Sequence, residues 1–130
     1  MTPPASLRAA WRILGWFGVA LLIWLSLMPS PPKVADLAHL DKLEHLLAYA
    51  LLMLWFAQLR PSIPQRAITA AALLALGIGL EFAQASSGVR EFSIADMIAD
   101  LAGITLGWFA APPRGPDLLA VTHKLVSSQV

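Results

Sequence analysis

Apolar residues form four long blocks along the chain, at residues 11–28, 43–59, 67–85 and 92–111, and the short stretches between them contain most of the proline and charge. A helix of about 20 mostly apolar residues can span a membrane. Helices of a soluble bundle keep one polar face each, but these blocks are apolar around the whole circumference except near one end. The pattern therefore predicts an all-α fold, a four-helix transmembrane bundle in which short loops make neighbouring helices antiparallel.

Proline marks the ends of these blocks and divides the chain no further. The first block ends at Pro29-Ser30-Pro31-Pro32, an expected extended linker, and the fourth ends at Pro112-Pro113. We expect residues 1–130 to form a single membrane domain with a short tail at 112–130. Beyond Pro116 this tail is mildly amphipathic, and it either lies on the cytoplasmic surface or stays disordered.

The first block has an alternative interpretation as a cleaved signal peptide, because Arg8 and Arg12 accompany an apolar run at residues 13–27. No A-x-A-like cleavage site follows this run, and proline crowds the junction. These two features favour retention of the block as a first spanning helix.

Lys and Arg are distributed unevenly between the two sides of the four predicted spans. The side with both termini and the second loop has Arg8, Arg12, Arg60, Arg66, Arg114 and Lys124. The opposite side has only Lys33, Lys42 and Arg90. Basic residues concentrate on the cytoplasmic side of membrane proteins. We therefore expect a multi-pass protein of the bacterial cytoplasmic membrane with both termini in the cytoplasm and the first and third loops outside.

Composition agrees with this class of protein and excludes others. Hydrophobic residues make up 58% of the chain and charged residues 13%, against roughly 45–50% and about 25% in soluble domains. The formal net charge of +1 gives no electrostatic reason to expect nucleic acid as a partner. The chain has no cysteine, which excludes disulfides and a thiol nucleophile.

Polar residues that interrupt the apolar pattern gather at the outer ends of the last three spans. Helical spacing places them on faces that also carry small residues or Tyr49, which suits contact with other helices rather than with lipid. The candidate functional cluster consists of Asp41, Lys42, His45, Glu81, Gln84, Arg90, Asp96 and Asp100. Its members are candidates for binding a ligand or for acid–base chemistry.

Asp100 is the deepest of these residues. At 1.5 Å per residue it lies about 12 Å into the fourth span from Phe92, and a charged Asp at the membrane centre costs roughly 2.5–3.5 kcal/mol. We expect Asp100 to be paired, hydrated or protonated, with Lys42, His45 and Arg90 as the candidate partners.

Three motifs of this cluster resemble those of the VanZ-like family of small integral membrane proteins. They are Asp41-Lys42-x-x-His45 followed by Tyr49, Gly77-x-x-x-Glu81-x-x-Gln84, and Arg90-x-Phe92-Ser93-x-x-Asp96 leading to Gly103. The resemblance covers about residues 41–107. One position departs from the family pattern, because Asp100 stands where family members usually have Asn.

The resemblance implies a cell-envelope membrane protein with an outward-facing polar cluster, and the family takes its name from a protein associated with teicoplanin resistance. The expected function is to lower susceptibility to teicoplanin-type glycopeptides or to bind a lipid head group. The expected partners are membrane lipids, an amphiphilic glycopeptide or a lipid-linked cell-wall precursor.

Several alternatives remain open. The chain is a binding protein, a membrane enzyme that acts on a lipid-linked substrate, with His45 beside Asp41 as an oriented general base, or a transporter. Four helices are few for a transporter, and no inverted repeat is visible between the two predicted hairpins. The polar cluster has a purely structural alternative, in which it fixes the four helices to one another. Asp41, His45, Glu81 and Asp96 are plausible metal-ligand types, but no supporting motif accompanies them, and we expect no metal and no cofactor. Gly103 and Gly107 form a GxxxG motif that serves either close packing within the chain or a homo-oligomer.

Overall fold

The computed structural model describes residues 2–29, 40–88 and 90–130, and these residues form five helices and no strand. The helices are α1 (Ala5–Leu27), α2 (Leu40–Ala57), α3 (Ile63–Ser86), α4 (Ile94–Ala110) and α5 (Leu118–Ser127). The predicted all-α fold is confirmed. Of the linker predicted at 29–32, only Pro29 is among the described residues. Lys33 also lies outside them.

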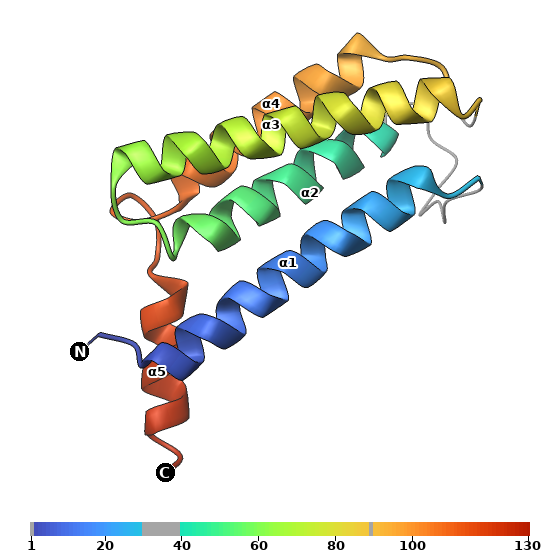
Figure 1. Cartoon of the computed structure of the whole chain (residues 1–130). Coiled ribbons are helices and arrows are strands. Elements are labelled where there is room, and N and C mark those ends of the chain that lie inside the picture. The colour runs from blue at the N-terminus through green and yellow to red at the C-terminus, as the bar shows by residue number, and fades with distance from the viewer. Residues whose placement is uncertain (1, 30–39, 89) are drawn as a thin grey trace.

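Helices α2, α3 and α4 lie side by side, α1 runs along them at an angle, and α5 lies beside the start of α1 (Figure 1). One end of this arrangement holds the last turn of α1 and α3 and the first turn of α2 and α4. We call it the polar end. The opposite end holds the first turn of α1 and α3, the turn between α2 and α3, and α5. We call it the arginine end.

Side-chain caps fix where three of the helices begin. The Ser62 hydroxyl accepts a hydrogen bond from the Gln65 backbone N–H at 3.4 Å, and α3 therefore begins at Ile63, before the predicted residue 67. The Ser93 hydroxyl accepts a hydrogen bond from the Asp96 backbone N–H at 3.2 Å, at the start of α4. Asp117 accepts from Ala120 at 2.8 Å, so that part of the predicted tail is a helix.

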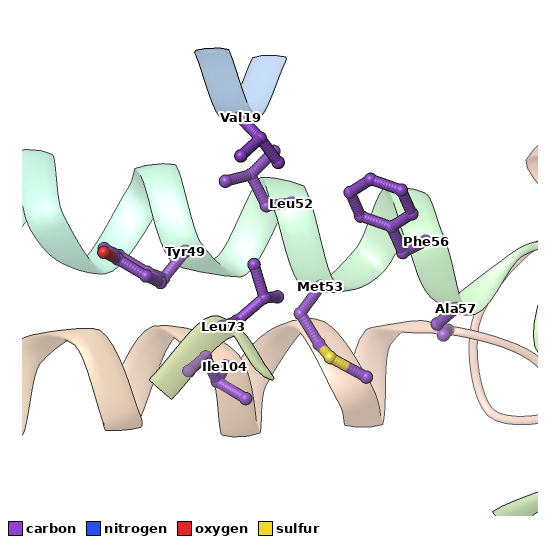
Figure 2. Close-up of a cluster of buried hydrophobic side chains, with 9 residues drawn as sticks. Val19, Tyr49, Leu52, Met53, Phe56, Ala57, Leu73 and Ile104 are labelled. Carbon is purple, nitrogen blue, oxygen red and sulfur yellow. The ribbon is translucent and has the colours of Figure 1, made fainter. Parts of the chain in front are cut away.

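The hydrophobic core forms around α2. Tyr49, Met53 and Ala57 repeat at helical spacing on its inner face, and each is at most 1% exposed (Figure 2). Val19 reaches this core from α1, and Leu73 and Ile104 reach it from α3 and α4. Helices α1 to α4 therefore all contribute to one core.

Two glycines allow α4 to lie directly against α2. A Cβ atom added at Gly103 would overlap the Leu46 carbonyl oxygen, and one added at Gly107 would overlap the Ala50 carbonyl oxygen. Both glycines are buried. The GxxxG motif is therefore used for packing within the chain, and an oligomer built on these glycines would have to displace α2.

Among the described residues, α1 and α3 are long and apolar enough to span a membrane. Only 17% of the apolar window of α1 and 28% of that of α3 is buried inside the chain. Core helices of soluble proteins are mostly buried, so these two helices do not behave as such core helices. Large apolar side chains are exposed on both helices, among them Trp16, Phe17, Ile68 and Phe82.

Candidate functional site

Three helices meet at the polar end and bring most of the predicted cluster together. His45 projects from α2, Asp96 and Asp100 from α4, and Glu81 and Gln84 from α3. The two aspartates are one helical turn apart and therefore share a face of α4. Asp96, Asp100, Glu81 and Gln84 are each at most 4% exposed.

The His45 imidazole lies between the two α4 carboxylates. Its Nδ1 is 2.8 Å from Asp100 Oδ1, and its Nε2 is 3.8 Å from Asp96 Oδ2. The His45 side chain is 16% exposed and the Asp100 side chain 2%. Of the candidate partners for Asp100, the structure selects His45.

These contacts correct one detail of the sequence interpretation. His45 was expected to be oriented by Asp41, which lies one turn away on the same helix. The residue within hydrogen-bond distance of His45 is Asp100, 55 positions away in the sequence. Asp41 lies farther out on α2 and contacts Lys42 instead, with 3.4 Å between Asp41 Oδ2 and Lys42 Nζ.

Lys42 links the buried part of the cluster to its exposed rim. Its Nζ donates a hydrogen bond to Asp96 Oδ1 at 3.1 Å, while its side chain remains 39% exposed. The hydrogen bond to Asp96 and the attraction to that carboxylate raise the pKa of the Lys42 ammonium above its ordinary value. Lys42 is therefore a stable positive charge at the mouth of the cluster.

Glu81 and Gln84 connect helices rather than contact His45. A Glu81 carboxylate oxygen accepts a hydrogen bond from the backbone N–H of Ser93, the residue that caps α4. The Gln84 side-chain amide donates to the Ser26 carbonyl oxygen of α1 at 2.8 Å. These two side chains fit the structural alternative, because they tie α3 to its neighbours.

Gly77 makes room for the deepest part of the cluster. A Cβ atom at this position would lie 2.6 Å from Asp100 Oδ2 and 3.1 Å from the Tyr49 hydroxyl oxygen. Even the smallest side chain would collide with the Asp100 carboxylate. The glycine of the Gly77-x-x-x-Glu81 motif therefore leaves space for the Asp100 carboxylate, and Glu81 contributes a polar contact.

Arg90 lies at the rim and is half-buried. Its backbone N–H donates to the Gln84 carbonyl oxygen at 3.5 Å. Within the described parts of the chain, no ion pair joins the Arg90 side chain to a carboxylate. The cluster therefore has two layers, a rim of Asp41, Lys42 and Arg90 and an interior of His45 and buried carboxylates.

This arrangement suits two kinds of chemistry. Cationic groups at the rim can bind an anion such as a phosphate. An imidazole held by a buried carboxylate can accept or donate a proton. Over residues 2–29, 40–88 and 90–130, no group of three or more His, Asp or Glu side chains is placed to hold a metal ion.

The sequence interpretation missed a second contact between distant residues, at the arginine end. The indole rings of Trp11 in α1 and Trp55 in α2 stack with centroids 3.8 Å apart. Each indole N–H donates to the other residue's carbonyl oxygen, at 3.0 Å from Trp11 and 2.8 Å from Trp55. The residues carried no spacing signal for this pair, because they lie on different helices.

The chain matches no protein-family model, no curated protein and no solved structure. The geometry of its own residues is therefore the basis for assigning a function.

Proposed function

We propose that the chain is an integral membrane protein of the bacterial cell envelope, with α1 to α4 spanning the cytoplasmic membrane and the polar end facing outward. The exterior of all four helices supports this proposal, because large apolar side chains are exposed on each of them. Examples with at least 50% exposure are Trp16, Phe17, Trp24, Leu51, Ile68, Phe82, Ile98, Leu106 and Phe109. An apolar surface of this kind would cause aggregation in water and is stable in lipid.

The distribution of charge supports the orientation. Arg8, Arg60 and Arg114 all lie near the arginine end, which the bias of basic residues towards the cytoplasm assigns to the inside. Both termini then face the cytoplasm. The first turn of α2, with its charged Asp41 and Lys42, lies at the outer interface, and the apolar span begins after it.

We further propose that the chain is a VanZ-like protein whose polar end binds the head group of an amphiphile and thereby lowers susceptibility to teicoplanin-type glycopeptides. The observation that supports this function is that three motifs, far apart in sequence, converge on one cluster with a buried interior and with Lys42 and Arg90 at its rim. Lys42 and Arg90 suit a phosphate, and the carboxylates suit an ammonium group or sugar hydroxyls.

The test is glycopeptide susceptibility in a sensitive Gram-positive host that expresses the wild-type chain, Asp96→Ala or Glu91→Ala. Asp96→Ala removes the acceptor that holds Lys42, whereas Glu91 is an exposed acid at the same end and serves as the matched control. With membrane levels shown to be equal, we expect protection against teicoplanin from the wild type and the control and none from Asp96→Ala. Equal susceptibility of cells with and without the wild-type chain would contradict the proposal.

A second candidate function is a membrane enzyme that acts on a lipid-linked envelope substrate. The 2.8 Å contact between His45 and Asp100 favours it, because a buried carboxylate fixes the orientation of the imidazole. Lipid profiles of a deletion strain complemented with wild type, His45→Ala or His123→Ala test this function. Accumulation of one lipid intermediate with His45→Ala alone would support an enzyme, and unchanged profiles would count against it.

A further inference from the structure

A groove of about 530 Å³ lies at the arginine end, between α1, the end of α2 and the first half of α3. Its volume falls in the range of about 300–1,000 Å³ typical of small-molecule sites. On α1 it is lined by Arg8, Arg12, Trp16, Val19 and Ile23. These positions are three or four residues apart and form a single stripe along the helix.

The stripe changes from charged to apolar along its length. Arg8 and Arg12 lie in the first turns of α1, and Arg60 joins them from the turn after α2; all three are exposed. None of the residues that line the groove is acidic. The mouth of the groove is therefore a concentration of positive charge with no carboxylate to neutralise it.

From Arg12 to its apolar end at Ile23, the groove has about the depth of one membrane leaflet. From Arg12 to Ile23 the axis of α1 rises about 16 Å, at 1.5 Å per residue. Half of a hydrocarbon core of about 30 Å is about 15 Å. Residues of α2 and α3, among them Phe56 and Leu73, line the groove opposite α1. A lipid acyl chain that enters at the arginines would end near the middle of the membrane.

We propose that this groove binds one anionic phospholipid of the cytoplasmic leaflet, with its phosphate at Arg8, Arg12 and Arg60 and an acyl chain along Trp16 and Leu73. The inference rests on the proposed insertion in the membrane but not on the activity proposed for the polar end. A second copy of the chain is disfavoured as occupant. Copies inserted in the same orientation would bring their arginine ends together, and like charges would repel.

The test uses the full chain purified from vesicles made of equal parts phosphatidylglycerol and phosphatidylcholine, with retained lipid measured by native mass spectrometry. The variants are Arg12→Gln/Arg60→Gln, which reduces the charge of the mouth, and Ala72→Phe, which fills the apolar wall without a change of charge. Arg114→Gln is the matched control, because Arg114 lies at the same end outside the groove, with its guanidinium carbon 5.0 Å from the Phe109 ring centroid.

We expect the wild type and Arg114→Gln to retain one phosphatidylglycerol in preference to phosphatidylcholine. Attraction of an anionic lipid falls about fivefold for each basic residue lost, so the double variant should lose most of this preference. Ala72→Phe should retain less of either lipid. Equal retention of the two lipids by the wild type, an unchanged preference in the double variant, or a dimer without bound lipid would each overturn the inference.

Membrane flotation of each variant separates this result from the proposed function. Loss of lipid preference in a protein that still floats with vesicles overturns the lipid site alone. A wild-type chain that does not float overturns the proposed membrane insertion.

Discussion

At the polar end, Lys42 Nζ lies 3.1 Å and His45 Nδ1 2.8 Å from carboxylate oxygens of α4. At the arginine end, the cations Arg8, Arg12 and Arg60 line a groove that has no carboxylate in its wall. The difference accompanies the close packing of α4 on α2. Glycine lets α4 lie on the backbone of α2, and the side chains of Lys42 and His45 meet carboxylates there. The arginines between α1, α2 and α3 are exposed and lie at one end of a groove with an apolar wall.

The contacts that hold each end together differ as well. The Lys42–Asp96 ion pair and the His45–Asp100 hydrogen bond link α2 to α4 at the polar end, whereas two stacked tryptophans link α1 to α2 at the arginine end. This contrast suggests that the polar end is specified by a few exact contacts. The arginine end retains space for a molecule that is not part of the chain.

Gly103→Leu should cause the largest loss of stability, because it would push α4 away from α2 and separate Lys42 and His45 from their carboxylate partners. The added atoms meet the Leu46 backbone rather than a movable side chain. We expect a loss of stability at or above the upper end of the roughly 1–3 kcal/mol typical of overpacking. Thermal unfolding in detergent measures it, and Gly79→Leu is the control, since a Cβ at Gly79 meets no atom within 4 Å. Equal effects of the two variants would show that close α2–α4 packing is not required.

Asp100→Ala should have the next largest effect, because it leaves the His45 imidazole buried without its acceptor. Removing one partner of a buried hydrogen bond costs about 1–3 kcal/mol. Asp100→Asn retains an acceptor oxygen and should cost clearly less. Chemical denaturation of both variants in the same detergent measures the difference, and an Asn variant as unstable as the Ala variant would mean that the negative charge itself holds the polar end together.

Trp55→Phe tests the contact at the arginine end. The change removes the N–H that donates to the Trp11 carbonyl oxygen but keeps an aromatic ring for stacking. We expect a loss of about 0.5–1.5 kcal/mol in the free energy of unfolding. Trp24→Phe is the control, because Trp24 is 61% exposed. If both variants unfold like the wild type, the tryptophan pair does not stabilise the link between α1 and α2.

The smallest expected effect is a pH dependence from Lys42. Its pKa is raised in the folded protein above the ordinary value of 10.5 by the hydrogen bond to Asp96. The stabilisation is therefore fully present below pH 10.5 and is lost as the pH rises through the higher folded pKa. The difference in melting temperature between wild type and Lys42→Met should shrink above that pH. A difference that stays constant would show that the ammonium group contributes nothing to the pairing.

Much of the fold was predictable from the sequence because its signals are local. The apolar blocks predict helices, and Pro29 and Pro112 mark two of their ends. The helix α5 also had a local signal, because Asp is a good N-cap residue. The Asp117 side chain accepts a hydrogen bond from the backbone N–H of Ala120, three residues later. The prediction places the start of the first helix at Trp11, whereas α1 begins at Ala5, because Arg8 and Arg12 interrupt the apolar pattern there.

The residues of the candidate site were predictable from the sequence, but the contacts between them were not. Helical spacing identifies neighbours on the same helix, which explains why Asp41 was assigned as the partner of His45. The actual partner, Asp100, is brought close by the packing of α2 against Gly103 and Gly107, a tertiary effect. The groove at the arginine end is likewise formed by residues of three helices, although the spacing of Arg8, Arg12 and Trp16 places these three on one face of α1.

The most direct test of the account is the membrane orientation of the two ends, measured with single cysteines in a chain that has none of its own. Exposed positions are Ser86 at the polar end and Pro61 and Gln129 at the arginine end. With a membrane-impermeant maleimide, we predict labelling of Ser86→Cys in intact cells and of Pro61→Cys and Gln129→Cys only after lysis. Labelling of Pro61→Cys or Gln129→Cys in intact cells, or of none of the three until lysis, would contradict an outward-facing polar cluster.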